Sequence, residues 1–164
     1  MVTVAREPPC VENVVPARHL KADQAKMEEM YESKFTEINT RQWGAGHIRP
    51  HNIATNICDI STIPVQKPCD PRCFLNDENY CKAQVIRCIV ASDANTHNPP
   101  VVHSRANNAE KKISVAEAER LMLWPAGVTD GWCAKVHMNH PRELRMKMIG
   151  NAISGQHLRE ILAR

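Results

Sequence analysis

The stretch that decides the fold is residues 114–130, Ser-Val-Ala-Glu-Ala-Glu-Arg-Leu-Met-Leu-Trp-Pro-Ala-Gly-Val-Thr-Asp. Ser114 and Glu117 have the spacing of a capping box, in which the serine side chain accepts a bond from the backbone three residues on and the glutamate reaches back. This pattern predicts a short helix that begins after Ser114. Pro125 predicts its end, because proline cannot continue a helix.

Two further helices are predicted downstream of this stretch. Residues 141–149 begin with a proline, which favours the first helical turn, and Gly150 is expected to stop the helix. Residues 155–163 form the last helix, with apolar residues at helical spacing. The C-terminal third of the chain is therefore predicted to be helical.

The N-terminal third mixes strands with one helix. Residues 8–16 hold a short apolar run bounded by prolines, which is typical of a strand end that enters a loop. Residues 18–34 are rich in Ala, Lys, Glu and Met at helical spacing and predict an amphipathic helix. Two short strands, around 35–39 and 53–60, are expected to pair as a hairpin.

Residues 61–112 separate these two regions and have no helical period. They contain five prolines, and only residues 84–91 have the β-branched run of a buried strand. We therefore predict a loop-dominated insert.

Composition narrows the function classes without choosing among them. The chain has 164 residues, of which 43% are hydrophobic and 24% charged, as in ordinary globular domains. A net charge of +3 is too small to indicate a nucleic-acid partner by itself. The start resembles no secretory signal, and no run approaches the roughly 20 apolar residues of a membrane span, so we expect no membrane partner.

The cysteines favour a reducing compartment. Seven cysteines are an odd number in a chain without an export signal, which favours free thiols over a disulfide framework. The spacings of Cys58, Cys69, Cys73, Cys81 and Cys88 contain no Cys-x-x-Cys pair. We therefore favour free thiols over structural zinc and expect no metal site, although His47 and His51 lie nearby in the sequence.

Three motifs, in one order, resemble the late conserved blocks of the DNA cytosine-5 methyltransferases. Glu12-Asn13-Val14 matches the Glu-Asn-Val block of that family. Residues 114–125 are similar to its Thr-x-Arg-Glu-x-x-Arg-Leu-x-Gly-Phe-Pro block, and residues 145–153 look like its closing Gly-Asn block. Residues 86–89 and 125–130 echo the de novo branch of the family. The resemblance covers residues 10–164.

The resemblance implies an α/β fold, a partial S-adenosylmethionine-dependent methyltransferase (Rossmann-like) sheet with an irregular target-recognition insert. Residues 1–60 would be the C-terminal portion of the catalytic core, 61–112 the insert, and 113–164 the late motifs and closing helix. The implied activity transfers a methyl group from S-adenosyl-L-methionine to C5 of a flipped cytosine in double-stranded DNA. A half-sheet of this kind would expose an unpaired strand edge.

The resemblance also assigns roles to residues. Attack on C6 of cytosine requires a carboxylic acid at ring N3, and this role falls to Glu12. The nearest match to the Arg-x-Arg pair of the family is Arg49-Pro50-His51, so Arg49 would help hold the cytosine. His51 replaces the second arginine of the pair. Pro50 is expected to interrupt a central strand. The implied cofactor contacts are Asn13, Gly150, Asn151 and Ala152. The implied DNA contacts are Arg87, Arg142 and Arg145.

Two blocks of the family have no counterpart in the sequence: the Pro-Cys-Gln block that carries the nucleophile and the Phe-x-Gly-x-Gly cofactor loop. We therefore expect the chain to be inactive alone and to need a second polypeptide or an upstream segment that carries both. The alternative is a non-catalytic, methyltransferase-like regulatory or DNA-binding partner. The implied location is the nucleus in a eukaryote and otherwise the cytoplasm.

Overall fold

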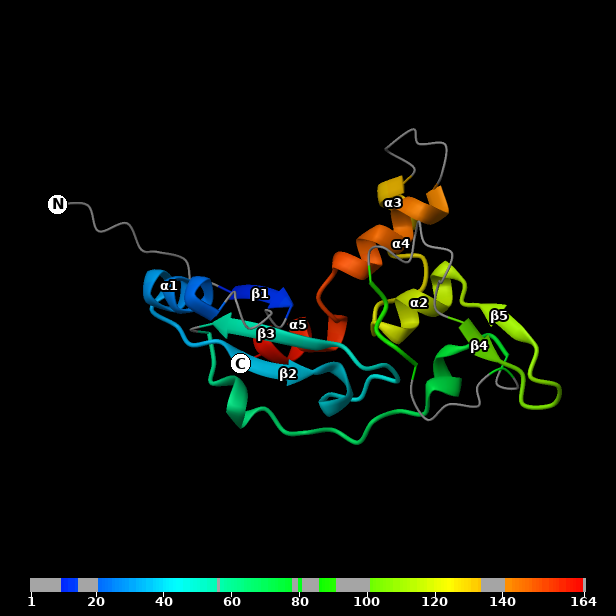
Figure 1. The fold of residues 1–164 in the computed structure, drawn as a ribbon, viewed down its shortest axis with the longest axis horizontal. Coiled ribbons are helices and arrows are strands. Elements are labelled where there is room, and N and C mark those ends of the chain that lie inside the picture. The colour runs from blue at the N-terminus through cyan, green and yellow to red at the C-terminus, as the bar shows by residue number, and fades with distance from the viewer. Residues whose placement is uncertain are drawn as a thin grey trace.

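The computed structural model describes residues 10–14, 21–55, 57–77, 80, 86–90, 101–133 and 141–163. Figure 1 shows two groups of elements side by side: a sheet with helices α1 and α5, and a group made of helices α2, α3 and α4 with a small hairpin. None of the described helices is long and apolar enough to cross a membrane.

The main sheet has three strands in the order β1-β3-β2, which are β1 (Cys10–Val14), β2 (Thr36–Asn39) and β3 (Pro50–Thr55). The central strand β3 runs antiparallel to both neighbours, so the predicted hairpin pairing with β2 is confirmed. The predicted bounds of the second strand, 53–60, are wrong, because β3 covers Pro50–Thr55 and the described residues 57–60 are not in a strand. The expectation that Pro50 interrupts a central strand is wrong. Pro50 is the first residue of β3, where the missing N–H and the fixed φ of proline are tolerated.

Strand β1 lies at one edge of this sheet. Its backbone pairs with β3 from Cys10, opposite Thr55, to Val14, opposite His51. No other strand in the described parts of the chain pairs with the far edge of β1. The described sheet thus has an unpaired edge on the strand that carries the Glu-Asn-Val block.

Helix α1 (Lys21–Tyr31) occupies the predicted region and lies beside β1 (Figure 1). The sequence predicts an amphipathic helix, but the described helix buries little apolar surface. Met30 is 66% exposed, and Met27 is the one apolar side chain described on the helix that is half-buried. The Glu28 side chain ties the segment after the helix back to it, since it accepts a bond from the backbone N–H of Phe35 at 3.0 Å.

The insert contains a hairpin that the sequence did not predict. Strands β4 (Val101–His103) and β5 (Glu110–Lys112) pair antiparallel. Of the predicted strand at 84–91, the structure describes residues 86–90, in which Ile86 forms one isolated bridge with His47. The remaining residues of that prediction lie outside the described part. Short 3-10 turns complete the loops, at Thr40–Gln42, Ile60–Thr62 and Pro71–Phe74.

The C-terminal helices are α2 (Val115–Leu121), α3 (Asp130–Cys133), α4 (Pro141–Asn151) and α5 (Gly155–Leu162). The predicted capping box is confirmed, with Ser114 accepting from the Glu117 N–H at 3.2 Å and Glu117 accepting from the Ser114 N–H at 2.7 Å. Helix α4 continues one residue past Gly150, the predicted stop.

The described residues form two buried apolar clusters. One joins α2 and α4 to the insert and includes Ile89, Val102, Ile113, Leu121, Met146 and Ile149. The other packs α5 against the sheet and contains Ile38, Trp43, Ile53, Ile60, Ile63 and Ile161. Full burial of one such aliphatic side chain stabilises a fold by roughly 1.5–3 kcal/mol. The first cluster therefore fixes α4 against α2 and the insert, and the second fixes α5 against β3.

Candidate functional site

Arg49 joins three distant parts of the chain. It lies directly before β3 and is only 3% exposed. Its Nη2 donates to the carbonyl oxygen of Gly150 at 2.8 Å, and its Nη1 donates to the carbonyl oxygen of Ile89. The predicted site residues Arg49 and Gly150 are therefore in direct contact across 101 positions of sequence.

The contact with Gly150 has a clear electrostatic basis. The last carbonyls of a helix have no partner within the helix, and they form the negative end of its dipole. Gly150 is in the last turn of α4, so a buried guanidinium at its carbonyl both satisfies an orphan acceptor and meets a favourable field. Burial lowers the pKa of Arg49, and these bonds oppose the cost of desolvating its charge.

His51 stands at the second arginine position of the family motif and behaves differently from an arginine. Its Nε2 accepts a hydrogen bond from Nε of Arg49, so this nitrogen carries no proton. Burial lowers the pKa of His51 from 6.5 to about 4, which keeps the ring neutral near pH 7. The structure therefore places one buried positive charge here where the family motif has two.

Two more histidines, absent from the sequence-based site, surround this centre. His47 and His157 are fully buried, and burial lowers their pKa values to about 4 and about 3. The ring of His157 meets Trp43 edge to face at 4.4 Å between centroids. Neither ring nitrogen of His157 has a hydrogen-bond partner among the described residues. No local spacing in the sequence pointed to this cluster.

Glu12 and Asn13 lie within β1, where the register places them opposite Ile53 and Asn52 of β3. Their side chains lie outside the part of the structure that is described. The backbone position still matters, because β3 pairs with the strand that carries the Glu-Asn-Val block and begins directly after Arg49. The catalytic role of Glu12 stays a prediction.

The Gly-Asn block lies where α4 ends. Gly150 is buried, Asn151 is exposed, and Ala152 is half-buried against the apolar cluster around α2. An exposed amide beside a buried glycine suits one wall of a cofactor pocket, since the amide offers both a donor and an acceptor. Contact of these residues with S-adenosylmethionine stays a prediction. The sequence supplies no counterpart of the cofactor loop.

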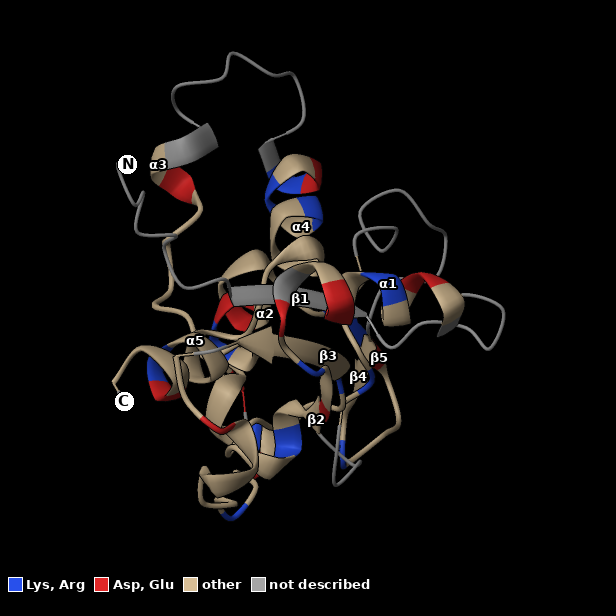
Figure 2. Ribbon diagram, turned by 90° about the vertical axis from the view of Figure 1, so that its left-hand side faces the viewer, with Lys and Arg blue, Asp and Glu red and all other residues tan. Residues whose placement is uncertain are grey.

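The three candidate DNA contacts differ in their surroundings. Arg87 and Arg142 are exposed, and Nη1 of Arg87 donates to the Cys88 carbonyl at 3.0 Å. Arg145 is held inside the protein, with its side chain only 16% exposed. Basic residues are spread over several elements, among them α1 and α4, as Figure 2 shows. Contact of these arginines with DNA stays a prediction.

Arg145 belongs to a buried network around Glu119, which no local sequence pattern indicated. The Glu119 carboxylate accepts bonds from the Gly127 N–H at 2.6 Å, the Thr129 hydroxyl at 2.6 Å and Arg145 Nη2 at 3.1 Å. Arg145 also pairs with Asp130. Burial would raise the pKa of Glu119, but these hydrogen bonds outweigh it and lower the pKa. The network fixes the turn after α2 to α4.

The cysteines that the structure describes form no metal site. Cys69 and Cys73 are exposed thiols, and Cys58 and Cys88 are half-buried thiols. Within the described residues, no group of three or more His, Cys, Asp or Glu side chains is placed to hold a metal ion. Cys81 lies outside the described residues.

Comparison with known proteins gives the class of fold. No family model and no curated protein matches the sequence. The structure is similar to that of the Dnmt2 methyltransferase of S. pombe, with a TM-score of 0.63 and 11% identity over 99% of this chain and 67% of that one. It is also similar to the methyltransferase EhMeth of Entamoeba histolytica, with a TM-score of 0.55 and 12% identity over 95% of this chain and 62% of that one.

These similarities show that the chain has the α/β, Rossmann-like fold of methyltransferases. The predicted fold class is confirmed. The chain spans about two thirds of the length of each of the two solved structures. At identities of 11% and 12% the comparison bears on the fold alone.

Proposed function

We propose that this chain is the C-terminal portion of a DNA cytosine-5 methyltransferase, and that it becomes active with a segment or subunit that supplies the nucleophile and the cofactor loop. The observation that carries the proposal is the bond from Arg49 to Gly150. It joins two separated motif positions, of which the resemblance assigns one to the cytosine and the other to the cofactor. The methyltransferase fold supports the same interpretation.

In this proposal Glu12 acts on the target base. A carboxylic acid that protonates or hydrogen-bonds N3 makes C6 of the cytosine more electrophilic, and such assistance is typically worth about 10²–10⁴-fold in rate. The edge position of β1 supports the need for a complement, because the far edge of the Glu-Asn-Val strand, within the described sheet, is available for pairing with another strand.

The role of Arg49 in holding the cytosine stays a prediction, and in this proposal Arg49 is also a positioning residue. It holds the last turn of α4, and with it Asn151, against the start of β3 and the Ile89 segment of the insert. Asn13, Asn151 and Ala152 would contact S-adenosylmethionine, which supplies the methyl group when bound. Arg87 and Arg142, both exposed, would contact the phosphates of double-stranded DNA.

The second candidate function is a non-catalytic partner of a methyltransferase. The neutral, buried state of His51 favours it, because the second arginine charge of the family motif is absent. The sequence also lacks the Pro-Cys-Gln nucleophile.

A reconstitution assay separates the two candidates. We expect no transfer of labelled methyl groups to DNA by the purified chain alone, since the sequence has no Pro-Cys-Gln block to supply a nucleophile for C6. Joined to a compatible half with the cofactor loop and nucleophile, the chain should support transfer. The partner function would be favoured by two results together. The reconstituted enzyme would show no methyl transfer, and addition of this chain would raise the rate of methyl transfer by a separate, active methyltransferase. Methylation by the chain alone would contradict the proposal.

A further inference from the structure

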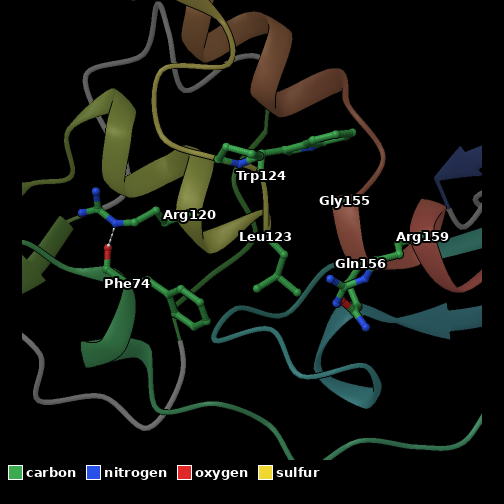
Figure 3. Close-up of a pocket in the computed structure, with 8 residues that line it drawn as sticks. Phe74, Arg120, Leu123, Trp124, Gly155, Gln156 and Arg159 are labelled. Carbon is green, nitrogen blue, oxygen red and sulfur yellow. Dashed lines mark hydrogen bonds between the residues drawn. The ribbon is translucent and has the colours of Figure 1, made fainter.

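A pocket of about 520 Å³ opens where the Pro71–Phe74 turn, the end of α2 and the start of α5 meet (Figure 3). It includes none of the residues assigned above to cytosine, cofactor or DNA. Its volume is within the range of about 300–1,000 Å³ that is usual for small-molecule sites. The side chains used in the argument below are Phe74, Arg120, Leu123, Trp124, Gln156 and Arg159.

The backbone of Leu123 is strained at this pocket. Its φ is 58°, in the left-handed region that leucine rarely adopts. The resembling family motif, Arg-Leu-x-Gly-Phe-Pro, has glycine at this position, where that conformation carries no steric cost. Strained residues persist where the surrounding structure holds them, and they cluster at binding sites. A leucine here keeps the strain and adds an apolar wall to the pocket.

Three close contacts hold Leu123 in this conformation. Its N–H donates to the Arg120 carbonyl at 2.8 Å, and the next residue, Trp124, donates from Nε1 to the Ile153 carbonyl at 3.0 Å. Gly155 packs so closely that a Cβ atom there would lie 2.5 Å from the Leu123 carbonyl oxygen. The turn and the start of α5 are thus locked together, which preorganises the pocket.

The side chains that line the pocket indicate which class of ligand it can bind. Phe74, Leu123 and Trp124 offer apolar and aromatic surface, on which a flat ring can stack. Arg120 and Arg159 are the charged residues among those described around the pocket, and no carboxylate is among them. Arg120 is oriented by bonds from Nε to the Phe74 carbonyl at 3.0 Å and from Nη2 to Asn76 at 2.6 Å. Arg159 is exposed and bonded to Gln156.

We propose that this pocket binds one nucleotide unit, with its base against Trp124 and Leu123 and its phosphate at Arg159. Stacking on aromatic side chains together with arginine contacts to phosphate is the usual chemistry of single-stranded nucleic-acid sites. The nucleotide comes from a free mononucleotide or from an unpaired stretch of a nucleic-acid strand. This binding is separate from methyl transfer and does not require the missing half.

The test measures binding by the full chain. The probes are a labelled single-stranded oligothymidylate, an abasic oligonucleotide of equal length, and adenosine monophosphate as competitor. We expect the abasic probe to bind at least about fivefold more weakly, because base stacking is lost. Arg159→Ala should weaken oligothymidylate binding about tenfold, since a charge-assisted phosphate contact is lost. The matched control Arg105→Ala removes an exposed charge outside the pocket and should change binding less than about twofold.

Leu123→Gly gives a readout that a purely structural role would not produce. We expect it to weaken oligothymidylate binding about fivefold or more while the Tm is held or raised, because glycine relieves the left-handed strain. If the Tm falls, Leu123→Asn repeats the test, since asparagine also tolerates this conformation. Competition by adenosine monophosphate would identify the mononucleotide as sufficient, and its absence would identify a strand. Equal binding of the abasic probe, or equal effects of Arg159→Ala and Arg105→Ala, would overturn the proposal.

Discussion

Replacing Arg49 with methionine removes every donor of the buried guanidinium while keeping a side chain of similar length. The carbonyls of Ile89 and Gly150 then lose the hydrogen bonds that Arg49 donates. A buried acceptor left without its donor costs about 1–3 kcal/mol. Removal of the desolvated charge offsets part of this loss. We expect the free energy of unfolding to fall by about 2–4 kcal/mol for Arg49→Met.

Urea unfolding followed by circular dichroism measures this change. Arg49→Lys keeps the charge but cannot reach three acceptors in different directions, so it should lose stability too, by a smaller amount. The control is Arg41→Met, which removes an arginine outside the buried centre and should change stability by less than about 0.5 kcal/mol. If Arg49→Met matched Arg41→Met, the bonds to Gly150 and Ile89 would not hold these segments together, and the positioning role would fail.

The three buried histidines predict acid sensitivity. Their folded pKa values, about 4 for His47 and His51 and about 3 for His157, lie below the ordinary 6.5. Below pH 6.5 the unfolded chain therefore binds more protons at these histidines than the folded chain does. Their contribution to the free energy of unfolding should be constant above that pH and should fall by several kcal/mol towards pH 4, because each tenfold change in a protonation equilibrium is worth about 1.4 kcal/mol. A Tm that is flat between pH 7 and pH 4.5 would contradict this. Ser114→Ala should cost about 1 kcal/mol of unfolding free energy by removing the cap of α2, and an unchanged urea midpoint would count against the capping box. Glu119→Gln should cost about 2–3 kcal/mol, because it removes the charge that faces half-buried Arg145, and the effect should shrink when Arg145 is already methionine. Additive losses in that double-mutant cycle would show that the two side chains do not act together.

Local signals explain which parts of the fold could be predicted from the sequence. The capping box at Ser114 and Glu117 depends on residues three apart, and the structure reproduces it. Short apolar runs predict the pairing of β2 with β3, although β3 begins three residues before the predicted strand and ends at Thr55. Strand β5 carries no such signal, because it reads Glu-Lys-Lys and is a strand through its pairing with β4.

In the candidate site, too, local motifs can be predicted from the sequence, whereas contacts between distant segments cannot. Arg49 and Gly150 were named from motifs, but their bond spans 101 positions and no local pattern contains it. The network around Glu119 was missed for the same reason, since Thr129 and Arg145 meet it only after α2 and α4 pack. The left-handed backbone of Leu123 had one signal in the sequence: a leucine stands where the family motif has glycine.

The most direct test of the central claim is the rate of methyl transfer by the reconstituted enzyme with Glu12→Gln. Because the acid would act in the transition state, the rate should fall about 10²–10⁴-fold while DNA affinity stays nearly constant. In the same enzyme Asn151→Ala should mainly raise the KM for S-adenosylmethionine, which separates chemistry from cofactor binding. If Glu12→Gln kept full activity, the Glu-Asn-Val match would be coincidental, and the non-catalytic partner would become the better account of this chain.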